Sequence, residues 1–123
     1  MRIGAAQIPV TTNVEDNLKN ILEACDWAVK NKLDYLLTPE CALSGYDTMS
    51  WNLNTCGPTE QAMEKLKEYS KNTGLGLAIG TLWIYDKDKQ GTGFGNGIHR
   101  NQLTFIQKGE IIGYVAKRNI AEC

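Results

Sequence analysis

The sequence predicts an α/β fold in which two main helices pack on a mixed β-sheet. Three observations lead to this prediction. Short apolar runs alternate with helical patterns in the first half of the chain, in the order strand, helix, strand, helix. A longer apolar run, Leu75–Tyr85, follows the second helix. Two alternating segments separated by Lys108 and Gly109 then indicate an antiparallel hairpin.

The first helix is expected over about residues 13–31. Thr12 and Glu15 have the spacing of a capping box, which satisfies free backbone N–H groups at a helix start. Apolar residues then recur at helical spacing, namely Val14, Leu18, Ile21, Leu22, Cys25 and Val29. Strands are expected on either side, at Arg2–Ile8 and at Asp34–Thr38. This order predicts a right-handed βαβ unit with parallel strands.

The second helix is expected from Pro58 and Thr59 to about Asn72. Proline is favoured in the first turn of a helix, and Gly74 provides a stop. The polar segment before it, Asp47–Cys56, is expected to form an irregular or short helical stretch over a crevice.

Three strands are expected in the second half of the chain. Leu75–Tyr85 is the first, and the glycine-rich loop Asp86–Gly97 follows it. Arg100–Gln107 and Glu110–Lys117 alternate in polarity and form the predicted hairpin.

Composition and charge exclude several classes of protein. The chain has 123 residues, 42% of them hydrophobic and 22% charged, as in ordinary globular domains. Thirteen basic and fourteen acidic side chains give a net charge of −1, so neither nucleic acid nor an anionic membrane is an expected partner. The longest apolar run is too short to span a bilayer, and the N-terminus is a poor signal peptide. A cytoplasmic protein is expected.

Cysteine and histidine usage argues against a metal site. The four cysteines contain no CxxC pair, so neither zinc ligands nor a disulfide framework is indicated, and free, mainly buried thiols are expected: Cys25, Cys41, Cys56 and Cys123. His99 is the only histidine and is expected at the surface or in a loop. His99 is thus the single histidine of this chain that a Ser-His-Asp triad could use.

The stretch LLTPECALSGY, Leu36–Tyr46, organises the sequence. Pro39 cannot donate to a sheet and must end the strand before it, so Glu40 emerges at the carboxyl end of that strand. Ligand crevices of open α/β sheets lie at such ends. Gly45 permits a turn before Tyr46. The alternative is that Pro39 and Glu40 open a helix, whose first turn favours an acidic residue.

Lys117 is the second residue of interest. Apolar neighbours at the end of the hairpin would hold its ammonium near the crevice, where it needs a counter-charge that Glu40 could supply. The alternative is an exposed strand terminus.

Cys41 adjoins Glu40, and neighbouring side chains on extended backbone point to opposite sides. Cys41 is therefore expected to pack into the core.

Four stretches, MRIGAAQIPV, LLTPECALSGY, IGTLW and NQLTFIQKGEIIGYVAKRNI, together resemble the nitrilase, or carbon-nitrogen hydrolase, superfamily in order and spacing. PECALSGY resembles the element that carries the family's catalytic glutamate, which matches Glu40. The stretch from Asn101 resembles the family's Asn-led strand and its Tyr-x-x-Lys ending, which places the catalytic lysine at Lys117. The similarity runs from Met1 to about Ile120.

The resemblance implies part of an α-β-β-α sandwich and a Glu-Lys-Cys triad that needs no cofactor. Glu40 would be the general base and Lys117 would stabilise the tetrahedral intermediate, while Tyr46 would contact substrate. The family's nucleophilic cysteine lies on a later strand-to-helix elbow, and Cys123 follows Lys117 too closely to match it. Residues 1–123 are therefore expected to be the N-terminal part of a hydrolase domain that is incomplete at its C-terminus.

The resemblance to the nitrilase superfamily implies an amide, carbamoyl or nitrile substrate and no metal. The chain by itself would be inactive and would expose a hydrophobic face and sheet edges, which favours a homo-oligomer or a complementary C-terminal segment as partner. One alternative is a non-catalytic binding or interaction module on the same scaffold. Another is a flavodoxin-like nucleotide binder that uses Gly91–Gly97, although this stretch lacks the Lys-Ser/Thr ending of a P-loop.

Overall fold

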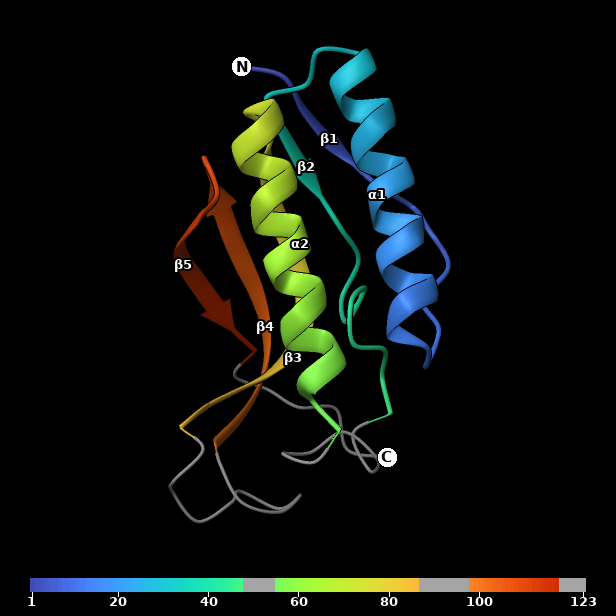
Figure 1. The fold of residues 1–123 in the computed structure, drawn as a ribbon, viewed down its shortest axis with the longest axis vertical. Helices are drawn as coiled ribbons and strands as arrows, with labels where there is room; N and C mark the ends of the chain where they lie inside the picture. Colours follow the sequence, from blue (N-terminus) through green and yellow to red (C-terminus); the bar gives the residue numbers. More distant parts are fainter. Residues whose placement is uncertain (48–54, 87–97, 118–123) are drawn as a thin grey trace.

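The computed structural model describes residues 1–47, 55–86 and 98–117, and these residues form one mixed sheet with two helices (Figure 1). The elements are β1 (Ile3–Ala5), α1 (Val14–Lys30), β2 (Tyr35–Leu37), α2 (Gly57–Thr73), β3 (Gly76–Asp86), β4 (Ile98–Gln107) and β5 (Glu110–Ala116). Strands lie in chain order, with β1, β2 and β3 parallel and β3, β4 and β5 antiparallel. The predicted α/β class, mixed sheet and two main helices are confirmed.

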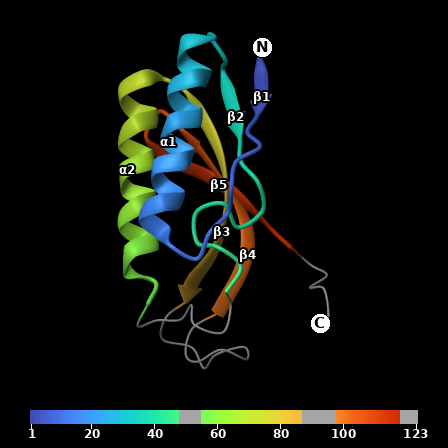
Figure 2. The same ribbon diagram turned by 90° about the vertical axis from the view of Figure 1, so that its right-hand side faces the viewer.

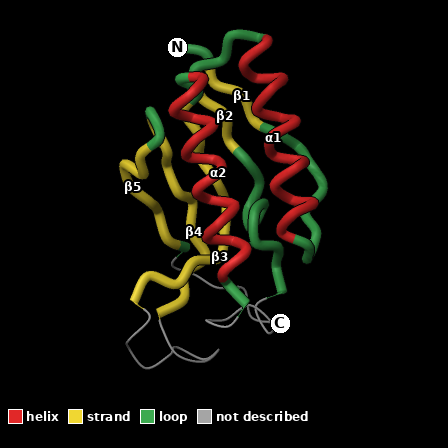
Figure 3. Tube along the Cα trace, in the orientation of Figure 1, coloured by secondary structure: helices red, strands yellow, loops and turns green. Residues whose placement is uncertain are grey.

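Both helices cover the same face of the sheet (Figure 2). The core lies between the helices and that face, and its largest fully buried apolar side chains are Ile21, Leu36, Leu43, Met63, Leu66, Leu77, Ile79 and Ile106. Figure 3 shows no described helix on the opposite face. No helix in the described ranges has both the length and the apolar character needed to cross a membrane.

The helix predictions are confirmed except for one cap. Asn13, and not Thr12, is the N-cap of α1, because the backbone N–H of Asp16 donates to Asn13 Oδ1 at 2.9 Å. The predicted capping box of Thr12 and Glu15 is therefore wrong by one residue. Gly74 adopts a positive φ of 78° and ends α2, as expected.

Strand β1 is shorter than the predicted Arg2–Ile8. Its neighbour in the sheet is β2, whose register pairs Ile3 with Tyr35 and Ala5 with Leu37. Pro39 ends the extended segment that contains β2, so β1 has no neighbouring strand to pair with beyond that point. The expected hairpin is confirmed, and both turn residues, Lys108 and Gly109, have the positive φ of a type I′ turn.

Apolar side chains gather on the sheet face that the described helices leave open. A hollow of about 360 Å³ lies on this face and is lined by Met1, Ile3, Tyr35, Leu36, Leu37, Ala78 and Phe105. Ile3 and Val115 are more than half exposed, at 66% and 62%. The expectation of an uncovered hydrophobic face is met within the described residues, and association through it remains a prediction.

A buried asparagine ties α1 to the chain that follows β2. Asn17 is fully buried, and its Nδ2 donates to the carbonyl of Leu43 at 3.0 Å and to that of Thr11 at 2.8 Å. Its Oδ1 accepts from the backbone N–H and from the hydroxyl of Thr11. The Asn17 side chain therefore satisfies polar backbone groups in two separate loops, the loop before α1 that contains Thr11 and the segment after β2 that contains Leu43.

We predict that Asn17→Ala destabilises the protein by about 1–3 kcal/mol, because the buried carbonyl of Leu43 loses its donor. Chemical denaturation monitored by circular dichroism measures this change. Asn72→Ala on the exposed side of α2 is the matched control and should change stability by less than about 0.5 kcal/mol. Equal stabilities for the two variants would contradict the anchoring role of Asn17.

Candidate active site

Glu40 lies in a tight turn at the carboxyl end of β2. The backbone N–H of Ala42 donates to Pro39 O at 3.2 Å, and that of Gly45 donates to Cys41 O at 2.8 Å. The segment is a turn, so the alternative in which Glu40 opens a helix is wrong. Gly45 has φ of 80°, and a Cβ there would lie 2.3 Å from the Thr11 carbonyl oxygen, so glycine is required.

This turn packs directly on the backbone of β3 at Gly80. The N–H of Leu43 donates to Gly80 O at 3.0 Å, and Gly80 N–H donates to the hydroxyl of Thr38 at 2.9 Å. A Cβ on Gly80 would lie 2.1 Å from the carbonyl oxygen of Pro39 and 3.0 Å from Cys41 N. Gly80 thus permits the close approach that places Glu40, although in the sequence it is only a break in an apolar run.

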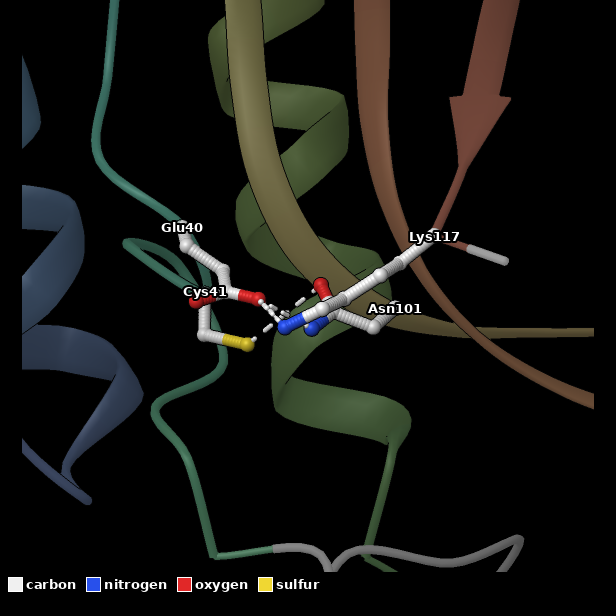
Figure 4. Close-up of polar contacts among 4 residues, drawn as sticks. All are labelled: Glu40, Cys41, Asn101 and Lys117. Atoms are coloured by element: carbon white, nitrogen blue, oxygen red, sulfur yellow. Dashed lines mark hydrogen bonds and ion pairs between the residues drawn. The ribbon is translucent and has the colours of Figure 1, made fainter. Parts of the chain in front are cut away.

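Lys117 follows the last residue of β5 and reaches Glu40. Its backbone N–H donates to Asn101 O at 2.8 Å, which continues the β4–β5 pairing by one residue. Its Nζ donates to Glu40 Oε1 at 2.8 Å (Figure 4). The structure therefore brings the two predicted residues together, and both side chains remain partly exposed, at 40% for Lys117 and 43% for Glu40.

Asn101 completes the contacts of Glu40. Its side-chain Nδ2 donates to the same oxygen, Glu40 Oε1, at 2.8 Å. Sequence reasoning noted this asparagine as the start of a strand and gave it no role. The predicted hairpin implies the β4–β5 register that places Asn101 opposite Lys117. The contact between the Asn101 side chain and Glu40, in the turn after β2, could not be predicted from the sequence.

Glu40 and Lys117 each stabilise the charged form of the other. The hydrogen bond from Lys117, followed by the one from Asn101, lowers the pKa of the Glu40 carboxyl below its ordinary value. The hydrogen bond to Glu40 raises the pKa of the Lys117 ammonium. Both groups are consequently charged at neutral pH.

Cys41 is buried as predicted, but for a different reason. Its φ of 53° is left-handed, so the assumption of extended backbone that turned its side chain away from Glu40 is wrong. The thiol instead points toward the pair and donates to Asn101 Oδ1 at 3.6 Å (Figure 4). Burial, followed by the charge of Glu40, raises the pKa of the Cys41 thiol to about 11. It therefore stays protonated at neutral pH.

Tyr46 lies near this cluster, and the other predicted residues lie elsewhere in the fold or outside the described residues. Tyr46 is 55% exposed, and partial desolvation, followed by the charge of Glu40, raises its pKa. His99 lies in β4 and is half-buried. Cys25 and Cys56 are buried and are not in disulfides, as expected. Residues 48–54, residues 87–97 and Cys123 lie outside the described residues.

The pair lies at an open hollow of about 370 Å³ on the uncovered face of the sheet. Apolar walls from β2, β4 and β5 surround its charged end, and the lining residues are Leu37, Thr38, Glu40, Gly80, Asn101, Gln102, Leu103, Val115, Ala116 and Lys117. Within the described ranges, no three His, Cys, Asp or Glu side chains gather as metal ligands would. The arrangement offers a carboxylate and an ammonium to a small molecule with an apolar body.

Comparison with known proteins decides the family. The family model described as "Carbon-nitrogen hydrolase" matches residues 2–122. The chain belongs to the carbon-nitrogen hydrolase family. Nitrilase homolog 2 from Dictyostelium discoideum is 27% identical over 111 residues, which are 90% of this carbon-nitrogen hydrolase chain and 32% of that protein. The chain thus spans about a third of that relative's length.

Solved structures show the same fold. An amidase from Nesterenkonia sp., of the nitrilase superfamily, superposes with a TM-score of 0.79 at 17% identity, covering 100% of this chain and 44% of the amidase. A glutamine-dependent NAD(+) synthetase from Cytophaga hutchinsonii gives 0.73 at 25% identity, covering 98% of this chain and 19% of the synthetase. The five-stranded sheet with its two helices is therefore a nitrilase-type arrangement.

We predict that Gly80→Ala separates the Glu40 turn from β3 and destabilises the fold by about 1–3 kcal/mol, because the added Cβ meets backbone atoms. Thermal and chemical unfolding measure the loss. Gly113→Ala in β5 is the matched control, since a Cβ there has nothing within 4 Å. If both alanine variants were equally stable, the close contact at Gly80 would be refuted.

The titration of Glu40 supplies a second prediction. The pKa of Glu40 is lower in the folded state than in the unfolded chain, so ionised Glu40 stabilises the fold. This stabilisation is fully present above the unfolded pKa. It is lost as the pH falls through the lowered pKa of the folded state. Lys117→Gln should raise the pKa of Glu40 toward its ordinary value. Nuclear magnetic resonance of the Glu40 side-chain carboxyl carbon, followed from neutral to acidic pH, measures both curves. A titration unchanged in Lys117→Gln would show that the ion pair does not form in solution.

Proposed function

We propose that this chain supplies the glutamate and the lysine of an active site that hydrolyses the carbon-nitrogen bond of an amide, a carbamoyl compound or a nitrile. The observation that carries the proposal is the 2.8 Å contact between Glu40 Oε1 and Lys117 Nζ at the charged end of the hollow. Membership of the carbon-nitrogen hydrolase family supports the reaction class.

Glu40 would act as the general base. It is ionised at neutral pH, and its partly exposed position lets a second group approach. Pairing with Lys117 lowers its basicity, but the same ammonium favours a thiolate close to it. A thiol that enters the hollow would give its proton to Glu40 while its sulfur forms a bond to the substrate carbon.

Lys117 would stabilise the charge that develops on the substrate. When sulfur adds to an amide carbonyl, the carbon-oxygen double bond becomes a single bond and the oxygen becomes negative. The ammonium of Lys117 beside Glu40 is placed to bind that oxygen. Collapse of the intermediate breaks the carbon-nitrogen bond, the leaving nitrogen takes the proton from Glu40, and a thioester remains. Water, deprotonated by Glu40, then releases a carboxylic acid and regenerates the thiol.

The nucleophile is proposed to be a cysteine from a complementary C-terminal segment. Cys25 and Cys41 are buried with raised pKa values, and burial also holds Cys56 away from solvent. One structure of the Nesterenkonia amidase is described as showing acrylamide added to its active-site cysteine. Cys25, Cys41 and Cys56 are buried and are not joined in disulfides, which fits a reducing compartment, and we propose a cytoplasmic location.

The open sheet face supports this division of the domain. We propose that residues 1–123 form the N-terminal part of a hydrolase domain and that the rest of the domain, or a second copy, covers the apolar face beside the hollow. Substrate would then be enclosed between the two layers, with Tyr46 at the side of Glu40 as a further contact. Enclosure would exclude water and strengthen the electrostatic effect of Lys117.

The test is turnover of a panel of amides, carbamoyl compounds and nitriles by the protein made from its complete gene, followed by ammonia release. We expect Glu40→Gln to reduce kcat about 10²–10⁴-fold, because proton transfer is lost. Lys117→Met should reduce it about 10²–10³-fold, because the oxyanion loses its partner. The 123-residue chain alone should show no turnover.

A second ion pair provides the matched control. Lys67 contacts Glu64 at 3.0 Å on the exposed side of α2, so Glu64→Gln and Lys67→Met remove a similar pair remote from the hollow and should leave kcat unchanged. Hydrolysis that survives replacement of every cysteine would refute the triad. Substrate binding without turnover in the complete protein would favour the non-catalytic binding module.

A further inference from the structure

We propose that Asn101 is the positioning residue of this site, and that the thiol of Cys41 sets the orientation of its side-chain amide. The proposal deepens the proposed function and rests on it for the role of Glu40 as base. The positioning itself is a property of the folded chain and can be measured without turnover.

Asn101 is in contact with both members of the charged pair through different groups. Its side-chain Nδ2 donates to Glu40 Oε1 at 2.8 Å, while its backbone carbonyl accepts from the N–H of Lys117 at 2.8 Å. It therefore fixes the start of the Lys117 side chain and the end of the Glu40 side chain at once. The direct contact between the two charges follows from these two bonds.

The orientation of the amide matters because its two ends have opposite character. With Nδ2 toward Glu40, the amide donates to the carboxylate; with the amide reversed, Oδ1 would face a carboxylate oxygen at the same short distance and repel it. The Cys41 thiol donates to Oδ1 at 3.6 Å and therefore favours the first orientation. Figure 4 shows the Asn101 amide facing both the Cys41 sulfur and the Glu40 carboxylate.

Cys41 can serve in this way because it remains a thiol. It is 1% exposed, and burial raises its pKa to about 11, so its S–H is a permanent donor at neutral pH. A thiolate at this point would accept rather than donate and would favour the reversed amide. The left-handed turn at Cys41 and the absence of a side chain at Gly80 hold the sulfur beside β4.

One consequence concerns the two oxygens of Glu40. Asn101 Nδ2 and Lys117 Nζ both bind Oε1. The carboxylate is thereby held from one side, and Oε2 is the oxygen that would take a proton from an incoming thiol. Asn101 and Lys117 together thus leave Oε2 of Glu40 as the base, and the part of Asn101 is to position the carboxylate.

The test is the carboxyl titration of Glu40 by nuclear magnetic resonance in variants of the 123-residue chain, with circular dichroism to confirm folding. Asn101→Ala should raise the pKa of Glu40, because a donor to the ionised form is lost. Asn101→Asp should raise it further, because a second carboxylate then faces the first. An unchanged titration in folded Asn101→Ala would overturn the proposal.

Cys41 provides an independent test in case the Asn101 variants do not fold. Cys41→Ala removes the donor and should raise the pKa of Glu40, whereas Cys41→Ser retains a hydroxyl donor and should leave it close to that of the parent chain. Cys25→Ala, a buried thiol in α1, is the matched control and should have no effect. Equal titrations for Cys41→Ala and Cys41→Ser would show that the thiol does not orient the amide.

In the complete enzyme, Asn101→Ala should lower kcat about 10-fold or more with little change in KM, and should move the acid limb of the kcat/KM profile to higher pH. A structural role alone would lower the amount of active enzyme and leave the profile in place. Parental turnover in Glu40→Gln would refute the proposed function instead, and would leave the Glu40 titrations in the Asn101 and Cys41 variants standing.

Discussion

The contact between Glu40 and Lys117 is the interaction on which the site depends. The two residues are 77 positions apart, and their side chains meet at 2.8 Å only because β3 and β4 hold the turn after β2 and the end of β5 at the same end of the sheet. Gly80 lets the turn approach β3, and the β4–β5 register places Lys117 beside Asn101. The position of the pair is thus a consequence of backbone packing.

The pair itself contributes little to folding. Both side chains are partly exposed, and exposed ion pairs are weakened by water and salt. The fold instead depends on the apolar layer between the helices and the sheet, and on buried polar groups such as Asn17 that join separate loops. The scaffold gains little stability from this carboxylate and ammonium, which supports our proposal that the pair serves catalysis.

The sequence predicted the elements better than it predicted their contacts. Helical spacing, Gly74 and the Lys108-Gly109 turn determine local structure, so α1, α2 and the hairpin are where we expected them. The length of β1 depends on its partner strand, and it was overestimated. Glu40 and Lys117 were found from the family resemblance as well as from their positions. The roles of Gly80 and Asn101 depend on how a turn packs across the sheet, which no local pattern encodes.

As a carbon-nitrogen hydrolase chain that spans about a third of its Dictyostelium relative, this molecule presents its charged pair beside an apolar face. The most direct measurement of the central contact is zero-length cross-linking with a carbodiimide, followed by peptide mass spectrometry. An amide bond between the Glu40 carboxyl and the Lys117 amine is the predicted product, with the Glu64–Lys67 link as internal control. Recovery of the control link without any link between Glu40 and Lys117 would contradict the account.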